Sequence, residues 1–121
     1  MRIRGIGIDI VEFSQMQAHH SENFVRRILS AAEQSVYDIM TTEKRKLEYL
    51  AGRFAAKEAY TKAYGHFERP LNFNEVSVLP DDDGKPVIHS PYRPEDICHL
   101  SISHSPHYVV AVCQVIQTER D

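Results

Sequence analysis

The chain of 121 residues has no tryptophan, only two cysteines, five glycines and six prolines. So little glycine and proline excludes a collagenous or low-complexity chain. No apolar run approaches the roughly 18 residues of a membrane-spanning helix, so we expect no membrane partner. Acidic residues (17) outnumber lysine and arginine (14), which disfavours a general nucleic-acid binder. With 42% hydrophobic and 26% charged residues, the composition is that of an ordinary soluble globular protein.

The length predicts a single domain over residues 1–121. A chain this small buries only about 65% of its unfolded surface, so self-association is expected. The N-terminus carries Asp9 and Glu12 and no small-residue cleavage site, so we do not interpret it as a signal peptide and expect a cytoplasmic protein. Cys98 and Cys113 lie in apolar surroundings and are interpreted as buried reduced thiols, with a disulfide or a catalytic thiol as the alternative.

The hydrophobic pattern predicts an α+β fold in which one long helix packs on a mainly antiparallel sheet. Strands are expected over 2–12, 73–79, from 86, 99–103 and 108–116, and helices over 21–29, 32–40 and 43–65. The helix start signals are Ser21, Ser30 and Thr41 or Thr42, and Gly65 is a natural stop for the long helix. Asp83-Gly84 signals a hairpin turn. The last strand is nearly continuously β-branched and is predicted to be central and buried on both faces.

Glu58 is the most informative residue of the predicted long helix. At 3.6 residues per turn, the apolar Leu47, Ala51 and Phe54 project within about 40° of its direction. Glu58 is therefore expected at the centre of the apolar stripe, where an unpaired carboxylate is costly. Its charge needs a cation. The candidates are a metal ion in a catalytic site and Lys62, one turn further on, in a buried salt bridge.

Asp9 is unusual in the first predicted strand, where it shares a face with Gly5 and Gly7. Asp and Gly are both unfavourable in strands, so another element or a ligand should approach this face closely. A bulge with a capping Asp is the alternative. If the long helix packs across the glycines, Asp9 and Glu58 converge. Two carboxylates together with water and phosphate oxygens suit Mg²⁺, which we expect as cofactor.

Basic and Ser/His residues supply candidate phosphate contacts. Arg53 and Lys57 share one flank of the helix and Lys62 lies on the other, which suits phosphates that bridge a Mg²⁺ but also a solvated basic face. His104 and Ser105 lie where a predicted strand ends and can donate hydrogen bonds to a phosphate; a satisfied loop histidine is the alternative. The surrounding segment SISHSPHY has no G-x-S-x-G turn, which argues against a Ser/His hydrolase.

Two further polar runs are interpreted as surface features. Asp81-Asp82-Asp83 lacks the spacing and the later Glu of an EF-hand loop, and a solvated hairpin tip is the better interpretation. His19-His20 has no matching ligands nearby in the sequence, so surface residues are favoured over a zinc site.

Three sequence elements occur in a fixed order. They are Gly5-Ile6-Gly7-Ile8-Asp9, then Arg53-Phe54-Ala55-Ala56-Lys57-Glu58-Ala59 with Lys62, and finally Ser101-Ile102-Ser103-His104-Ser105. In this order and spacing the chain, from Ile3 to about Val115, resembles the 4′-phosphopantetheinyl transferases. The short length and the string LAGRFAAKEA make it similar to their stand-alone bacterial members, the holo-acyl-carrier-protein synthases.

The resemblance implies an enzyme of fatty acid biosynthesis that moves the phosphopantetheine arm of coenzyme A onto a serine of apo-acyl carrier protein and releases 3′,5′-ADP. It implies that Asp9 and Glu58 hold Mg²⁺ and that Lys62 completes the catalytic set. The residues then expected around coenzyme A are Arg53, Lys57, Lys62, His104 and Ser105, with the turn Gly84-Lys85-Pro86 bordering the adenine. It further implies a homotrimer in which adjacent subunits share each site.

Two features depart from the family pattern. Stand-alone members often carry a glycine-rich stretch after the long helix, whereas here residues 65–70 read GHFERP with one glycine, which affects the contact with the pantetheine arm. Position 15 is Gln where many relatives place a basic residue that meets the acidic carrier; Arg26 and Arg27 can serve the docking instead. The competing hypothesis is a non-catalytic nucleotide-binding trimer of the same fold.

Overall fold

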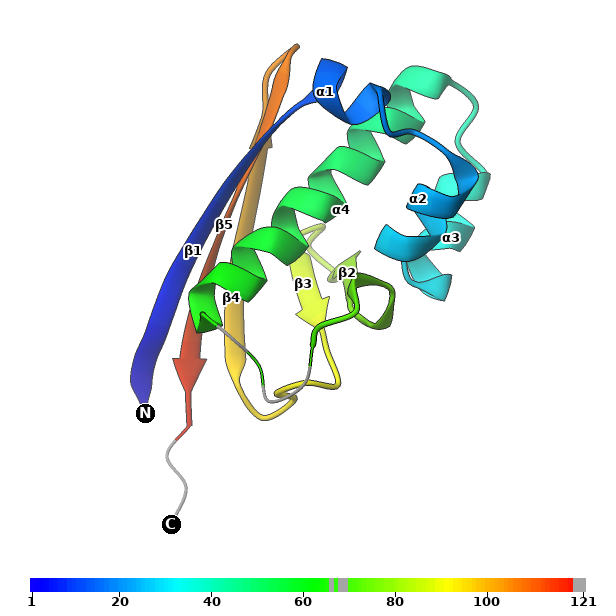
Figure 1. The fold of residues 1–121 in the computed structure, drawn as a ribbon. Helices are drawn as coiled ribbons and strands as arrows, with labels where there is room; N and C mark the ends of the chain where they lie inside the picture. Colours follow the sequence, from blue (N-terminus) through cyan, green and yellow to red (C-terminus); the bar gives the residue numbers. More distant parts are fainter. Residues whose placement is uncertain (66, 68–69, 119–121) are drawn as a thin grey trace.

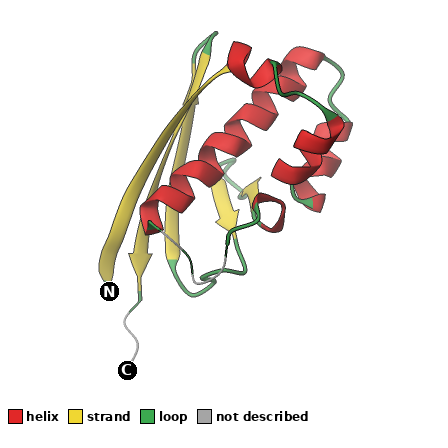
Figure 2. Cartoon of the chain, in the orientation of Figure 1, coloured by secondary structure: helices red, strands yellow, loops and turns green. Residues whose placement is uncertain are grey.

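The computed structural model describes residues 1–65, 67 and 70–118. Along the chain lie β1 (Arg2–Glu12), α1 (Phe13–Gln17), α2 (Glu22–Ile28), α3 (Ala31–Asp38), α4 (Glu43–Tyr64), the 3₁₀ helix η1 (Phe73–Glu75), β2 (Ser77–Pro80), β3 (Pro86–His89), β4 (Ile97–His104) and β5 (Tyr108–Gln117). Figure 1 shows α4 lying along one face of a sheet, and Figure 2 shows the other helices gathered on that same side. The predicted α+β class is confirmed.

The main sheet has the order β1-β5-β4, and both of its pairings are antiparallel. β2 and β3 form a separate antiparallel hairpin. Its turn is closed by Asp81, whose Oδ1 accepts hydrogen bonds from the backbone N–H groups of Asp83 and Lys85. Gly84 has φ +81°, so the predicted turn is confirmed, and the acidic run lies exposed at its tip as expected.

The helices begin and end largely where the sequence predicts. Ser21 Oγ accepts from Phe24 N at the start of α2, and Thr42 Oγ1 accepts from Arg45 N at the start of α4. α3 starts with a reciprocal capping box between Ser30 and Glu33. Gly65 ends α4 with φ +83°, a conformation that glycine adopts without strain.

The two glycines of β1 let α4 approach the strand closely. A Cβ at Gly5 would lie 2.2 Å from the carbonyl oxygen of Ala63, and one at Gly7 would lie 1.8 Å from that of Ala59. Both contacts are with backbone atoms, which cannot move aside without shifting the helix. The expected close approach of another element to this face is therefore confirmed, and that element is α4.

The structure corrects several expectations. The segment predicted as a strand over 73–79 starts as η1, and the strand begins only at Ser77. The short helix α1 was not predicted; it turns the chain after β1 and buries Phe13 and Met16. β5 is central, but it is not buried on both faces: Val109, Ala111, Cys113 and Val115 are buried, whereas Tyr108 and Val112 are exposed. Among the residues that the structure describes, none covers its outer side.

Candidate active site

Asp9 and Glu58 line the same cleft. It has a volume of about 830 Å³ and lies between β1, the segment from α1 to α2, and α4. The lining residues are Asp9, Ile10, Val11, Gln15, Met16, Ala18, His19, Phe24, Phe54 and Glu58. Asp9 comes from β1 just beyond the two glycines, and Glu58 comes from the facing side of α4. The predicted convergence of these two carboxylates is confirmed.

The two carboxylates influence each other electrostatically. Partial burial raises the pKa of Glu58, the negative charge of Asp9 raises it further, and Lys62 acts in the opposite direction. Asp9 is in regular register opposite Ala111, so the alternative of a bulge at Asp9 is wrong; the register shift lies between Ile3 and Gly5.

Lys62 holds Asp9 in place. Its Nζ donates to Asp9 Oδ1 at 3.0 Å and to the carbonyl oxygen of Ile8 at 3.1 Å, while the side chain stays 52% exposed. The ion pair of Lys62 is therefore with Asp9, rather than the predicted alternative with Glu58. Its position beside both carboxylates and in contact with solvent leaves its ammonium accessible to an anionic ligand.

The donor set fits a Mg²⁺ ion that keeps most of its water. Among the described residues, no group of three or more His, Cys, Asp or Glu side chains is placed to hold a metal ion. Two carboxylates in an open cleft are too few for a structural zinc or calcium site. Mg²⁺ is commonly bound by one or two carboxylates together with water and substrate phosphates. The repulsion that raises the pKa of Glu58 is the repulsion that a divalent cation would relieve.

Glu58 is not at the centre of the buried face of α4, as the sequence analysis expected. It is only partly buried, and it shares the edge of that face with the half-buried Leu47 and Phe54. The charged residue in the centre is Lys57, which is fully buried. Burial lowers the pKa of Lys57, and the carboxylate of Glu33 opposes that shift.

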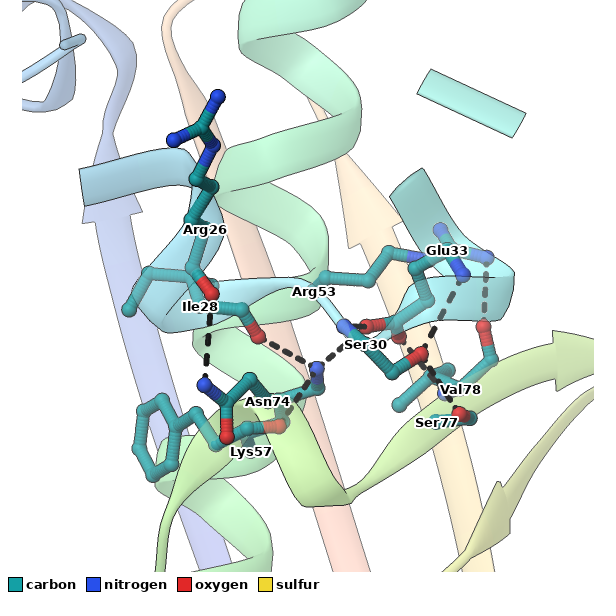
Figure 3. A network of polar contacts seen from close by, with 10 residues as sticks. Arg26, Ile28, Ser30, Glu33, Arg53, Lys57, Asn74, Ser77 and Val78 are labelled. Atoms are coloured by element: carbon teal, nitrogen blue, oxygen red, sulfur yellow. Dashed lines mark hydrogen bonds and ion pairs between the residues drawn. The ribbon is translucent and has the colours of Figure 1, made fainter. Parts of the chain in front are cut away.

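Lys57 donates to three acceptors of the chain itself. Its Nζ contacts the carboxylate of Glu33, the carbonyl oxygen of Ile28 at 2.7 Å and that of Phe73 at 3.0 Å (Figure 3). The ammonium carries no further proton for another partner. The structure thus places Lys57 away from the cleft, and the expectation that it surrounds the phosphates finds no support in its contacts.

Arg53 also points away from the carboxylates, toward β2. Its guanidinium donates to the carbonyl oxygen of Val78 at 3.3 Å and lies 4.2 Å from the ring centre of Tyr49. Its Nε is buried and has no hydrogen-bond partner among the described residues, so the side chain retains donor capacity. Arg53 does not line the cleft of Asp9 and Glu58 in a single chain.

The remaining predicted contacts of coenzyme A lie elsewhere on the surface. His104 ends β4, on the edge of the sheet opposite to β1, and Ser105 follows it; both are exposed. Ser105 Oγ accepts from the backbone N–H of Tyr108 at 3.2 Å. The turn Gly84-Lys85-Pro86 belongs to the β2–β3 hairpin and does not line the cleft either.

Several cleft residues were missed by the sequence analysis. His19 was interpreted only as a surface residue, yet it lines the cleft, and its ring lies 6.3 Å from that of Phe24. Phe24 in turn lies 6.1 Å from Phe54, which lies 5.9 Å from Phe73. Phe24 was recognisable as an apolar residue of α2. No local pattern in the sequence shows that the apolar face of α2 meets α4 beside Glu58.

The two departures from the family pattern have different outcomes. Residues 66, 68 and 69 of the predicted loop lie outside the described part of the chain. Phe67 is described, and its ring packs 4.6 Å from that of Tyr64 and 5.5 Å from that of Tyr92. Gln15 lines the cleft, and Arg26 and Arg27 are exposed on the last turn of α2.

The cysteines carry no site of their own. Both are free, with Cys113 buried and Cys98 partly buried on the neighbouring strand. The hydrogen bond with Cys98 and burial both raise the pKa of the Cys113 thiol. A thiol held neutral in this way is a poor nucleophile, which argues against a catalytic role for Cys113. The same hydrogen bond lowers the pKa of the Cys98 thiol.

Comparison with known proteins identifies the family. The family model of the 4′-phosphopantetheinyl transferase superfamily matches residues 5–113. The chain belongs to this superfamily. A holo-[acyl-carrier-protein] synthase of Bacillus pumilus is 44% identical over 113 residues, which cover 90% of this chain and 92% of the relative. One from Staphylococcus aureus strain Newman is 44% identical over 117 residues, 94% of each chain.

Solved structures agree with the sequence relatives. A crystal structure of a holo-(acyl-carrier-protein) synthase from Bacillus anthracis, in complex with CoA (3′,5′-ADP), matches with a TM-score of 0.84 and 40% identity. The match covers 95% of this chain and 97% of that one. The predicted family is confirmed, and the chain is a transferase. None of the helices in the described part is long and apolar enough to cross a membrane.

Proposed function

We propose that this transferase moves the 4′-phosphopantetheine arm of coenzyme A onto a serine of apo-acyl carrier protein in a Mg²⁺-dependent reaction that releases 3′,5′-ADP. The observation that carries the proposal is the cleft in which Asp9 and Glu58 meet beside the exposed ammonium of Lys62. The proposal extends to a single catalytic domain over residues 1–121, located in the cytoplasm and acting in fatty acid biosynthesis.

In the proposed reaction, the serine oxygen forms a bond to the β-phosphorus of coenzyme A, and the bond from that phosphorus to the bridging oxygen of the leaving nucleotide breaks. Mg²⁺ bound by Asp9 and Glu58 would supply charge neutralisation at the phosphates. Lys62, held on Asp9, presents its ammonium to the leaving phosphate. The serine proton passes to Glu58, or to a water that Glu58 orients.

We propose that the active protein is a homotrimer whose sites are shared between adjacent subunits. The side chains of Ile6, Ile8 and Ile10 on β1 are each more than 60% exposed on the outer face of the sheet, next to the exposed Val112 of β5. An apolar sheet face of this kind is typical of a surface covered in an assembly. Sharing would also bring Arg53, His104, Ser105 and the turn Gly84-Lys85-Pro86, which no single chain brings to its own cleft, to a neighbour's carboxylates.

The direct test is incubation of the protein with coenzyme A, Mg²⁺ and an apo-acyl carrier protein. Intact-mass spectrometry should show that the carrier gains one phosphopantetheine group, and omission of Mg²⁺ should prevent the gain. An unmodified carrier, with the protein folded and Mg²⁺ present, would contradict the proposal.

The variant Glu58→Gln tests the catalytic role of Glu58, and the wild-type protein tests the hypothesis of a non-catalytic nucleotide-binding trimer. Under our proposal, Glu58→Gln retains the fold and loses carrier modification. If Glu58 is only structural, modification in this variant equals that of the wild type. Coenzyme A binding without modification in the wild-type protein would favour the non-catalytic hypothesis.

A further inference from the structure

Lys57 and Glu33 form a fully buried ion pair next to the proposed catalytic residues. Both side chains are 0% exposed, and they come from α4 and α3, 24 residues apart in sequence. A buried ion pair is rarely a net source of stability, because hydrophobic residues of similar volume are often as good or better in its place. A contribution to stability alone therefore does not explain why this pair is buried here.

The carboxylate of Glu33 is as fully used as the ammonium of Lys57. Its Oε1 accepts from the backbone N–H of Ser30 at 2.9 Å and from Lys57, and its Oε2 accepts from the backbone N–H of Val78 at 2.7 Å (Figure 3). Ser77 and Ser30 join the network through their hydroxyl groups at 2.6 Å. A buried network with every member satisfied is rigid and favours a single geometry.

This network fastens separate segments to α4 at a single point. Through Ile28 it holds the end of α2, through Phe73 it holds η1, and through Glu33 it holds α3 and β2. The attached segments carry aromatic rings that contact Phe54: Phe24 on α2, at 6.1 Å, and Phe73 on η1, at 5.9 Å. Phe24 and Phe54 form the aromatic wall of the cleft that holds Asp9 and Glu58.

The metal-ligand pair is held by different contacts. Asp9 is fixed by the register of β1 and by Lys62, and neither is part of the Lys57 network. Glu58 follows Lys57 on α4, whose fit to β1 is set by the close approach at Gly5 and Gly7. The aromatic wall and the carboxylates of the cleft therefore depend on separate supports.

We propose that Lys57 and Glu33 are positioning residues, which set the aromatic wall of Phe24 and Phe54 against Asp9 and Glu58 and so align the substrate that lies on this wall. This inference rests on the proposed transferase function. Under this proposal, the ammonium of Lys57 pairs with the carboxylate of Glu33 and does not contact a phosphate. Disruption of the pair should weaken the alignment of substrate and leave the affinity for Mg²⁺ intact.

The test uses Glu33→Gln, which retains the shape of the side chain but replaces one accepting oxygen by an NH2 donor, and the double variant Glu33→Gln/Lys57→Met, which buries no charge. The double variant avoids an unpaired buried charge but leaves the carbonyl oxygens of Ile28 and Phe73 without their donor, so its Tm should lie below that of the wild type and above that of Glu33→Gln. The KM for coenzyme A or for the carrier protein should nevertheless rise about tenfold or more, since small misplacements at a reacting centre are costly. The half-saturating Mg²⁺ concentration should not change.

Tyr64→Phe is the matched control, because it removes the hydrogen bond between Tyr64 and Asp96 at the C-terminal end of the same helix, outside the Lys57 network. It should lower Tm and leave both KM values unchanged. If only the KM for the carrier protein rises, the aromatic wall aligns the carrier. If only the KM for coenzyme A rises, the wall aligns the pantetheine arm. Either result supports the proposal. Wild-type KM values in both Glu33 variants, or losses that only follow the folded fraction, would overturn it. An inactive wild-type protein would instead overturn the proposed function.

Discussion

At the scale of single residues, charged side chains in buried and half-buried surroundings define the candidate site and its support. Glu58 and Lys57 are neighbours in sequence but have opposite environments: one borders an open cleft and the other is fully enclosed. Helical periodicity identified this part of α4 as unusual, but it assigned the central place to Glu58. Lys57 is the buried one because α3 and β2 cover its side of α4. No local pattern in the sequence reveals which side of the helix these elements cover.

The pKa of Glu58 gives a pH-dependent prediction for the metal-free protein. Because burial and Asp9 raise this pKa above its usual 4.5, the folded state binds the proton more tightly than the unfolded state. The associated stability is full below the unfolded pKa and is lost as pH rises through the folded pKa. Glu58→Gln should therefore raise Tm in EDTA at neutral pH, and the gain should shrink towards acid pH. A gain that is constant from acid to neutral pH would contradict this explanation.

At the scale of elements, β1 and α4 were predictable because each carries a strong periodic pattern with clear end signals. The glycines of β1 also indicated that another element packs closely against this strand. By contrast, α1 and η1 are single turns, too short to show a period. The β-branched composition of β5 indicated its central place but could not show that one of its faces lacks a cover within the chain.

Substitution of Gly7 tests the contact between β1 and α4. Gly7→Ala would place a Cβ 1.8 Å from a backbone oxygen of Ala59, so we expect a loss of more than about 3 kcal/mol in the free energy of unfolding, or failure to fold. Gly52→Ala is the control, since the nearest atom to its Cβ is 4.0 Å away. Inside a helix this change should stabilise the protein by up to about 1 kcal/mol. Urea unfolding measures both, and a tolerated Gly7→Ala would refute the close packing.

At the scale of the whole molecule, one chain assembles only part of the predicted site. The sequence identified Asp9, Glu58 and Lys62, and the structure brings these three together. The phosphate candidates on β4 and on the β2–β3 turn lie apart from them. Motif order along the chain does not reveal whether residues meet within a chain or across an interface, so this part of the site stays a prediction.

The exposed face of the sheet supplies a test of the assembly. Ile8→Glu places a charge on a side chain that is 61% exposed on the outer face of β1, so we expect the proposed trimer to dissociate into folded monomers with little transfer activity. Ile39→Glu is the control, because Ile39 is 79% exposed but lies beyond α3, away from the sheet. Light scattering with size-exclusion chromatography gives the mass. A trimeric Ile8→Glu protein would rule out this face as the interface.

The central claim is that Asp9 and Glu58 bind one divalent cation between them. Isothermal titration calorimetry of Mg²⁺ into the protein saturated with coenzyme A measures this directly, for the wild type and for Asp9→Asn and Glu58→Gln. We predict one Mg²⁺ per site in the wild type and a severe loss of affinity in each single variant, with the fold retained by circular dichroism. Wild-type affinity in either variant would contradict the claim.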